Sequence, residues 1–238
     1  MKSVQCTIVE TKGSTPRKVG AKMLVFEDGS IQGTIGGGNL EKKVIENALE
    51  QIKAGKPKLF KHDLLHQHNM CCGGTMLIYI EPIMEKHKLF IFGSGHTGAA
   101  LAKYASDMDF EIYVIDDRKE YLNAITTEGI NKFNISYKEA LPTLPFDERT
   151  YVCIMTYEHS HDRDILSFCI KQPNAYLGMI GSQRKVELTK KMFIEGAIGT
   201  PEELTRIDMP MGLSIDAEGP NEIAISILAK LIALKNDN

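Results

Sequence analysis

The alternation of apolar and polar residues along the chain changes near residue 86. Between residues 4 and 83, apolar positions mostly alternate with polar ones, as in VQCTIVE, KMLVF and TMLIYI. Such alternation is typical of strands with one buried face. One segment, from Asn39 to Ile52, has apolar residues at helical spacing and predicts a helix with Asn39 as its N-cap. We therefore expect a small α+β domain over residues 1–86.

After residue 87 the pattern becomes apolar runs separated by helical segments. The predicted strands are LFIFG, EIYVIDD, KFNISY, TYVCIMT and AYLGMIG. Apolar strands that alternate with helices predict a parallel sheet covered on both faces. The predicted fold class is α/β: a Rossmann-like, doubly wound parallel sheet over residues 87–238, preceded by the α+β domain.

The first of these strands runs into the sequence Gly93-x-Gly95-x-x-Gly98 at the start of a small-residue helix. The first glycine permits a tight turn, the second lets backbone approach a pyrophosphate, and the third lets the helix pack closely on the strand. Asp116 ends the second strand at the position where a carboxylate accepts hydrogen bonds from a ribose diol. The same scaffold could instead hold another ligand, or none.

The segment after the fourth strand, MTYEHSHDRD, contains His159, His161 and Asp162. A histidine beside a carboxylate could perform acid–base work for a dehydrogenase. The segment could equally be a helix N-terminus with Asp162 as the cap. The sequence leaves both interpretations open.

A second glycine-rich turn, GMIGSQRK, follows the fifth strand. Gly181 opens it, Ser182 can cap the next helix, and Arg184 and Lys185 add cationic donors. These groups together predict an anion pocket.

The first half has its own candidate residues. Arg17 lies in a loop, KGSTPRKVGAKM, that is either structural or an anion clamp. Gly36, Gly37 and Gly38 directly precede the predicted helix. Three glycines there cost backbone entropy, and close approach of a ligand to the helix start is a physical reason to keep them.

The segment HDLLHQHNMCCGG contains three histidines and two cysteines, but their spacing matches no common zinc finger or ribbon. Cys72 precedes two glycines and is a candidate exposed thiol. Thiolates favour soft metals, including those carried by organic cofactors.

Composition narrows the function class. The formal net charge is −3 and the 28 Lys and Arg residues are scattered, so no nucleic-acid partner is expected. The N-terminus lacks the apolar core of a signal peptide, and the most apolar stretch, residues 223–234, is too short to span a bilayer. With five cysteines and no disulfide framework, we expect a cytoplasmic, reduced protein without stable membrane insertion.

Taken together, the motifs resemble one family, the xanthine dehydrogenase accessory proteins (XdhC/CoxI). The resemblance covers both halves of the chain. It is carried in one order by GSTPRKVGAKMLV, GTIGGGNLE, CGGTM, FGSGHTGAALA, VIDDR, MTYEHSHD, GMIGSQRK and GLSIDAEGPNEIAISILAKLI.

The resemblance implies a molybdenum cofactor chaperone. Such proteins bind molybdopterin or its dinucleotide form, protect it while a cysteine desulfurase-type sulfurase acts on it, and deliver it to a xanthine dehydrogenase-type molybdoenzyme of purine catabolism. The resemblance implies a carrier more than an enzyme. The alternative is an NAD(P)-dependent Rossmann oxidoreductase. Two small domains joined by a short link also suit a homodimer.

The resemblance also implies which residues bind the cofactor, without assigning any catalytic residue. Cys72 is the implied molybdenum ligand. The family commonly has cysteine after the third glycine of the GGG segment, where this chain has Asn39, so that thiol is absent. The full set of implied cofactor-binding residues is Arg17, Gly36, Gly37, Gly38, Cys72, Gly93, Gly95, Gly98, Asp116, His159, Gly181, Ser182 and Arg184.

Overall fold

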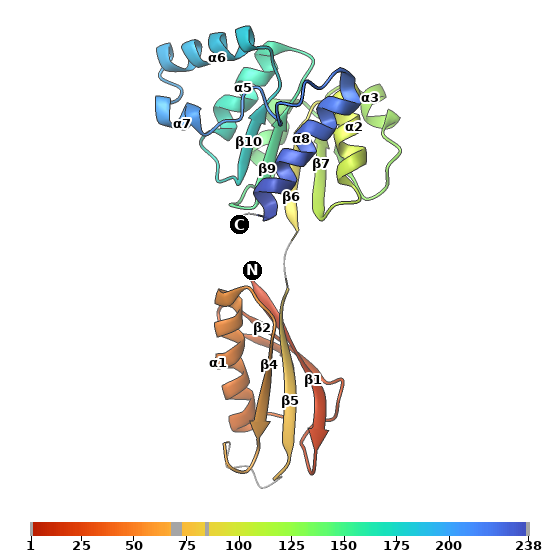
Figure 1. Cartoon of the computed structure of the whole chain (residues 1–238), viewed down its shortest axis with the longest axis vertical. Coiled ribbons are helices and arrows are strands. Elements are labelled where there is room, and N and C mark those ends of the chain that lie inside the picture. Colours follow the sequence, from red (N-terminus) through yellow and green to blue (C-terminus); the bar gives the residue numbers. More distant parts are fainter. Residues whose placement is uncertain (1, 68–72, 84–85, 237–238) are drawn as a thin grey trace. The chain divides into compact units, whose positions relative to one another are not determined.

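The chain folds into two compact units. The computed structural model describes residues 2–67, 73–83 and 86–236. Contacts between Cα atoms separate residues 1–85 from residues 86–238, one residue from the boundary that the sequence pattern predicts. Figure 1 shows each unit with its own sheet, and each is described by itself below.

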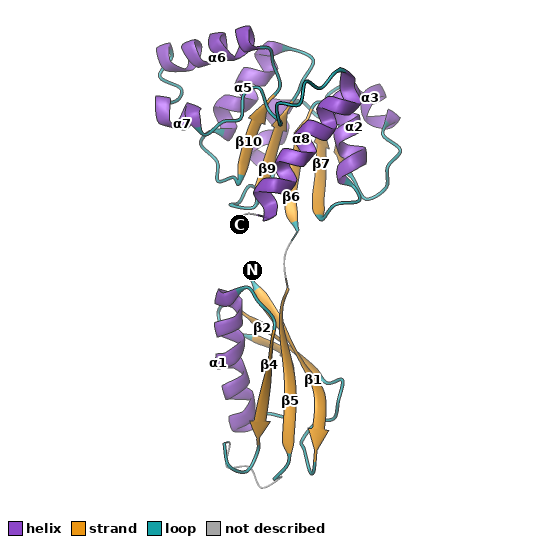
Figure 2. Ribbon diagram, in the orientation of Figure 1, coloured by secondary structure: helices purple, strands orange, loops and turns teal. Residues whose placement is uncertain are grey.

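The first unit is an antiparallel sheet with one helix (Figure 2). The sheet order is β3-β2-β1-β5-β4. A hairpin joins β2 to β3 around Asp28-Gly29, where Gly29 has φ +82°. The elements are β1 (Ser3–Lys12), β2 (Lys22–Phe26), β3 (Ile31–Gly33), α1 (Gly38–Ala54), β4 (Lys58–Asp63) and β5 (Thr75–Ile83).

Helix α1 covers one face of this sheet. Its residues Leu40, Val44 and Ala48 are fully buried among the inward-facing side chains of β1, β2 and β5. Fully burying a Leu or Val side chain stabilises a fold by about 1.5–3 kcal/mol. The predicted cap was wrong by two residues: the N-cap is Gly37, without a side-chain cap bond, and Asn39 lies inside the first turn.

The second unit confirms the predicted fold class. Its sheet is parallel throughout, in the order β10-β9-β6-β7-β8. A strand forms in each of the five predicted segments: β6 (His87–Phe92), β7 (Phe110–Ile115), β8 (Asn131–Phe133), β9 (Thr150–Ile154) and β10 (Tyr176–Met179). The prediction for KFNISY was partly wrong, because the strand ends at Phe133 and the side chain of Ser136 caps a helix that begins at Tyr137.

Helices cover both faces of the second sheet, as Figure 2 shows. One core packs α2, α3 and α8 against the strands, and another packs α4, α5, α6 and α7 against the opposite face. The helices are α2 (His96–Ala105), α3 (Lys119–Ala124), α4 (Tyr137–Ala140), α5 (His159–Cys169), α6 (Gln183–Glu195), α7 (Pro201–Thr205) and α8 (Gly219–Asn236), with a 3₁₀ helix at Leu141–Thr143.

The strand order fixes where a ligand can enter. The chain runs from β6 outward to β7 and β8, then returns to β9 on the other side of β6. The loops after β6 and β9 therefore diverge, and in open α/β sheets ligands bind in the crevice outside the carboxyl ends of the strands at such a point. The fold alone directs attention to residues 93–98 and 155–158.

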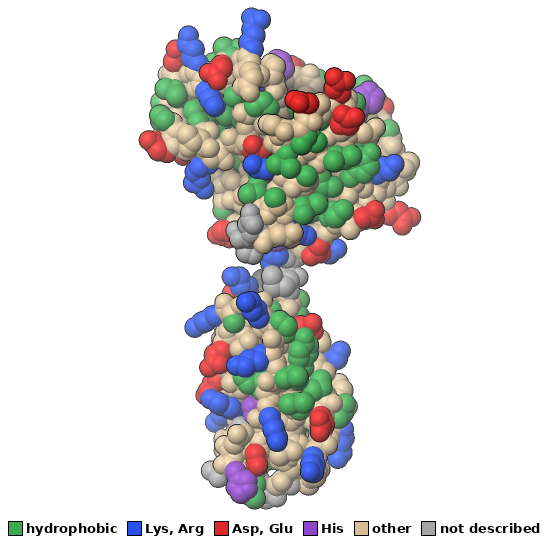
Figure 3. Space-filling view, viewed as in Figure 1, with side chains coloured by type: hydrophobic (Ala, Val, Ile, Leu, Met, Phe, Trp, Pro, Cys, Tyr) green, Lys and Arg blue, Asp and Glu red, His purple; other side chains and the backbone are tan. Residues whose placement is uncertain are grey.

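In the face drawn in Figure 3, acidic and basic side chains of the second unit are interspersed. Within the described part of the chain, no helix is both long enough and apolar enough to cross a membrane.

Candidate functional site

A cleft with both polar and apolar lining lies at the carboxyl edge of the second sheet. Its volume is about 350 Å³. Four strands contribute to it, because the segments that follow β6, β7, β9 and β10 all reach it. The lining residues are Gly95, His96, Thr97, Gly98, Arg118, Tyr121, Met155, Thr156, Tyr157, Ile180 and Pro220. We call this hollow the Rossmann cleft.

The three glycines of the turn differ in whether the fold leaves room for a side chain. Gly93 has φ +108°, and an added Cβ would lie 2.4 Å from the carbonyl oxygen of Met155. At Gly98 an added Cβ would lie 1.9 Å from the carbonyl oxygen of Gly93. Gly95 differs, because its φ is −61° and an added Cβ would meet nothing within 4 Å. The fold therefore requires Gly93 and Gly98, whereas Gly95 faces open space in the cleft.

Gly95 is also the N-cap of α2, without a side-chain cap bond. The first amides of a helix have no intrahelical acceptor and carry a partial positive charge. Because His96 and Thr97 line the cleft, these amides can meet an anion there. This part of the geometry agrees with what the glycine motif predicts.

Both carboxylate oxygens of Asp116 accept hydrogen bonds from other groups of the protein. Its carboxylate is fully buried, and Oδ2 accepts hydrogen bonds from Ser94 N at 2.7 Å and Ser94 Oγ at 2.9 Å. Arg118 donates to both oxygens, from Nε to Oδ1 at 2.9 Å and from Nη2 to Oδ2 at 2.8 Å. Burial alone would raise the pKa of Asp116, but the bonds from Arg118 and Ser94 hold it below its ordinary value.

Arg118 is the charged side chain that reaches the cleft. Its guanidinium lies against the rings of Tyr121 and Tyr157, with Cζ 4.1 Å from each ring centroid. The guanidinium of arginine stays charged in proteins, and the bond to Asp116 raises the pKa of Arg118 further. The cation is thus held in one place by an ion pair and two rings.

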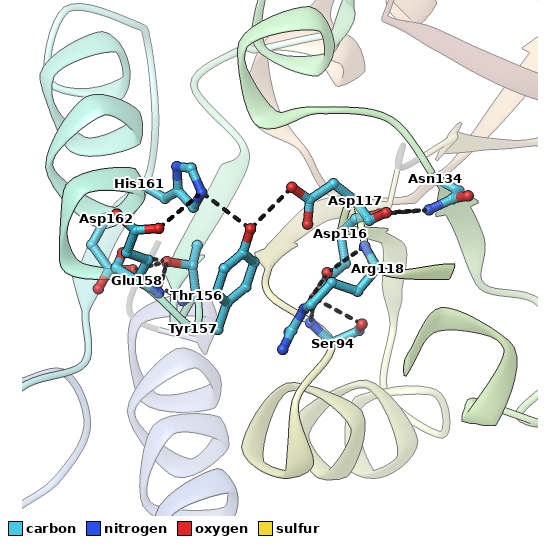
Figure 4. Close-up of polar contacts among 10 residues, drawn as sticks. All are labelled: Ser94, Asp116, Asp117, Arg118, Asn134, Thr156, Tyr157, Glu158, His161 and Asp162. Atoms are coloured by element: carbon cyan, nitrogen blue, oxygen red, sulfur yellow. Dashed lines mark hydrogen bonds and ion pairs between the residues drawn. The ribbon is translucent and has the colours of Figure 1, made fainter. Parts of the chain in front are cut away.

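Tyr157 connects the segment after β9 to the segment after β7 (Figure 4). Its hydroxyl donates to Asp117 Oδ2 at 3.1 Å and lies 3.2 Å from His161 Nε2. The ring of His161 lies 5.3 Å from that of Tyr137. His161 therefore helps to position Tyr157 over Arg118.

Asp162 organises the start of α5, but it is not the cap. The helix begins at His159 with Glu158 as N-cap. Asp162 is fully buried, and its Oδ1 accepts bonds from the amide and hydroxyl of Thr156 at 2.9 and 2.7 Å. Lys185 donates to Oδ2 at 2.6 Å. The cap interpretation was wrong, because the helix begins three residues before Asp162.

The second glycine turn leads to a separate hollow of about 190 Å³. The side chain of Ser182 caps α6 by accepting from Lys185 N at 3.3 Å. This hollow is cationic and shares no lining residue with the Rossmann cleft. It is lined by His159, Arg163, Ser182, Arg184, Lys185, Leu188 and Thr189. His159 and Arg184 are therefore together here, and the adjacent Gly181 packs against Lys185.

In the first unit the candidate residues are also neighbours. Gly36 has φ +139°, and an added Cβ would lie 2.5 Å from Cγ of Pro16, so the loop that carries exposed Arg17 packs on the glycine segment. Gly37 and Gly38 have positive φ and nothing within 4 Å of an added Cβ. Open space therefore lies beside the start of α1.

The candidate metal ligands lie largely outside the described residues. Cys72, Cys71 and His68 belong to residues 68–72, which the structure does not describe. Over residues 2–67, 73–83 and 86–236, no three His, Cys, Asp or Glu side chains are grouped as metal ligands. Cys6, Cys153 and Cys169 are buried, and burial raises the pKa of the Cys6 thiol to about 12.

Comparison with known proteins decides the family. Residues 89–231 match the XdhC Rossmann domain, and residues 2–63 match the XdhC and CoxI family. This chain belongs to the XdhC and CoxI family. The resemblance that the motifs carry is thereby confirmed.

Relatives of this XdhC/CoxI chain differ in length and name. The chain is 38% identical over 237 residues to the "Uncharacterized protein YqeB" of Escherichia coli (strain K12), aligning 97% of itself with 43% of that protein. It is 29% identical over 159 residues to a protein of Bacillus subtilis (strain 168) named as a probable subunit of xanthine dehydrogenase, aligning 66% of itself with 46% of that protein. The chain therefore spans less than half the length of these two relatives.

A third relative and a solved structure extend over most of both chains. The chain is 20% identical over 280 residues to the "Molybdenum cofactor insertion chaperone PaoD" of Escherichia coli (strain K12), with 98% of this chain and 83% of that protein aligned. The crystal structure of a xanthine dehydrogenase from Bacillus halodurans aligns with a TM-score of 0.56 at 24% identity, covering 100% of this chain and 93% of the other. The latter similarity shows the shared fold.

Sequence reasoning missed Arg118, Tyr121 and Tyr157 as lining residues of the cleft. The signal for Arg118 was available, because it follows Asp116 and Asp117 directly at a strand end. No such signal existed for Tyr157, which reaches Asp117 from 40 positions away. A contact between residues 40 positions apart in the sequence depends on the order of the strands in the sheet.

Proposed function

We propose that this chain is a molybdenum cofactor chaperone. It binds the cofactor, protects it while a cysteine desulfurase-type sulfurase acts, and delivers it to a xanthine dehydrogenase-type molybdoenzyme. The observation that carries the proposal is the Rossmann cleft, in which helix-start amides and a fixed cation face open space in a member of this family. The name of the relative PaoD supports the cofactor assignment.

The residues of the cleft fit an anionic pterin. The cofactor carries a phosphate, for which the amides at the start of α2 and the guanidinium of Arg118 are suitable donors. Gly95 leaves the space above the turn free of a Cβ. When bound, the cofactor supplies molybdenum chemistry for a client enzyme. The chain's own residues bind and orient it.

The other candidate residues are proposed as further cofactor contacts, each within its own unit. These are Arg17 and residues 36–38 in the first unit, and His159, Gly181, Ser182 and Arg184 at the second hollow of the second unit. Cys72 is the proposed soft ligand for molybdenum. We further propose that the chain acts as a cytoplasmic homodimer and turns over no substrate of its own.

Cofactor retention by the intact protein tests this proposal. The protein is incubated anaerobically with molybdopterin released from a molybdoenzyme, then separated by gel filtration and assayed for molybdenum and for oxidised pterin. We expect about one pterin per chain, with the control Arg206→Gln unchanged because Arg206 is exposed and lines a different hollow. Absence of retained pterin, together with steady oxidation of NADPH in the presence of a carbonyl or purine substrate, would favour the oxidoreductase alternative.

The role of Cys72 is tested in the same assay. Cys72→Ser should retain less molybdenum, because a hydroxyl is a poorer ligand than a thiolate for a soft metal. The control is Cys71→Ser, which changes the neighbouring cysteine. A variant of Cys169 would not serve, because Cys169 is buried in the core. Equal molybdenum retention by the wild-type protein, Cys72→Ser and Cys71→Ser would assign binding to polar contacts alone.

A further inference from the structure

Asp116 stands where a dinucleotide-binding carboxylate would read the ribose, yet it has no acceptor capacity left. A carboxylate offers about four lone-pair positions. Asp116 already receives five hydrogen bonds: two from Ser94, two from the guanidinium of Arg118 and one from the Arg118 amide at 2.9 Å. Its side chain is also 0% exposed. A free ribose diol would therefore find no acceptor at the end of β7.

Arg118 presents donors at the same place. Of the five N–H groups of a guanidinium, Nε and one on Nη2 donate to Asp116, and three remain. Among the described residues, Nη1 of Arg118 has no hydrogen-bond partner, and the side chain is 23% exposed toward the cleft it lines. Where this kind of site carries an arginine, the arginine accommodates a phosphate on the ribose.

The charges and aromatic rings around the Arg118 guanidinium favour an anionic ligand group at its free donors. Asp117 is exposed and accepts from the Tyr157 hydroxyl, and the charge of Asp116 is paired with Arg118. The start of α2 adds partial positive charge. The contacts with Tyr121 and Tyr157 hold the guanidinium in place before a ligand arrives, so less side-chain entropy is lost on binding.

We propose that Arg118 receives a phosphomonoester of the ligand, and that the cleft discriminates against ligands that offer a free ribose diol there. For the pterin, this inference rests on the proposed function and selects molybdopterin, whose phosphate is a monoester, over its dinucleotide form. The same chemistry is offered by the 2′-phosphate of NADPH. The test therefore includes both sources.

The experiment measures the binding of two matched ligand pairs to the intact protein. One pair is molybdopterin and its cytosine dinucleotide form, followed by co-elution, and the other is NADPH and NADH, followed by fluorescence titration. We expect the monoester member of at least one pair to bind about 10- to 100-fold more tightly, which is the range for a charge-assisted hydrogen bond.

Variants connect the discrimination to Arg118. Arg118→Lys keeps the charge but loses the planar donor pair, and should reduce the preference severalfold. Because Arg118→Gln leaves a buried carboxylate unpaired, the double variant Asp116→Asn with Arg118→Gln is the fold-preserving test, and it should abolish the preference. Arg206→Gln should keep the wild-type preference.

The outcomes separate this inference from the proposed function. Pterin retention without preference between its two forms, and no preference for NADPH, would overturn the inference and leave the chaperone proposal intact. A preference for NADPH over NADH without pterin binding would support the inference and overturn the chaperone proposal. Failure of all four ligands to bind would overturn both.

Discussion

Asp162 and Lys185 form a buried ion pair that joins the segment after β9 to the start of α6. Asp162 Oδ2 lies 2.6 Å from Lys185 Nζ, and their side chains are 0% and 12% exposed. Lys185 also donates to the carbonyl oxygen of Ile180 at 2.8 Å. One lysine therefore connects the first turn of α5 to the segment that follows β10.

Removing this lysine should destabilise the second unit. Lys185→Met leaves the Asp162 charge buried without its cation, which typically costs about 3–5 kcal/mol. The control is Lys191→Met, because Lys191 is 68% exposed and pairs with Glu195 only at 3.7 Å; its change should stay within about 1 kcal/mol. Urea unfolding measures both. Similar small changes in the two variants would show that the buried pair contributes little.

Alanine substitutions at Gly93 and Gly95 should have different effects, the first on stability and the second on ligand binding. Gly93→Ala places a methyl group against the carbonyl oxygen of Met155 at positive φ, so the free energy of unfolding should fall by several kcal/mol. Gly95→Ala should change it by no more than about 1 kcal/mol, since the position is sterically open. Retention of molybdopterin by Gly95→Ala should nevertheless drop, because the methyl group enters the cleft. Full retention would mean that the ligand lies elsewhere.

Tyr137 offers a test of buried polarity. Its hydroxyl is buried and has no hydrogen-bond partner among the described residues. Tyr137→Phe should be neutral or stabilising, by up to about 1 kcal/mol, because no bond is lost and a desolvated hydroxyl is removed. Tyr113→Phe is the matched control: its hydroxyl donates to Glu111 at 2.7 Å, so about 0.5–1.5 kcal/mol should be lost. A larger loss at Tyr137 than at Tyr113 would indicate a partner for the Tyr137 hydroxyl in solution.

The pKa of Asp116 predicts a pH dependence of stability. Despite its burial, the bonds from Arg118 and Ser94 place the folded-state pKa below the unfolded value of about 3.9. A lowered pKa contributes stability above the unfolded value, and this contribution is lost as the pH falls through the folded pKa. Urea unfolding from pH 7 to pH 3 should show this decline. Asp116→Asn should be less stable at pH 7 and decline less steeply; an unchanged slope would exclude Asp116 as its source.

Much of the fold follows from local patterns. Strands β6, β7, β9 and β10 were predicted because each is an apolar run bounded by helical segments, whereas β8, in the alternating segment KFNISY, is shorter than predicted. Gly93 was predicted to permit a tight turn, in agreement with its φ of +108°, and Gly98 to permit close packing, in agreement with the lack of room for a Cβ there. The N-cap of α1 was misplaced because Gly37, with φ +74°, ends the loop without any side-chain cap for the sequence to reveal.

The candidate site was only partly predictable. Asp116 was expected to face a ribose. The sequence places Arg118 two residues later at the strand end, but it does not show that the Arg118 side chain turns back to pair with Asp116. The sequence placed His159 and Asp162 together as a possible acid–base pair. In the structure, Asp162 accepts hydrogen bonds from Thr156 and Lys185. The His159 side chain is 73% exposed, and its Nδ1 lies 3.8 Å from the Asp162 carboxylate. These outcomes depend on competition among donors that only the folded chain brings together.

The parallel sheet and the glycine turn follow from the sequence alone, because periodicity and steric requirements are local properties of the chain. Which side chains face the Rossmann cleft depends on the tertiary structure. Tyr157 reaches Asp117 across 40 positions, and Lys185 reaches Asp162 across 23, because β9 lies beside β6 and β10 in the sheet. Strand order is a property of the whole fold. In this fold the Arg118 cation lines the cleft, where the glycine motif had predicted the Asp116 carboxylate.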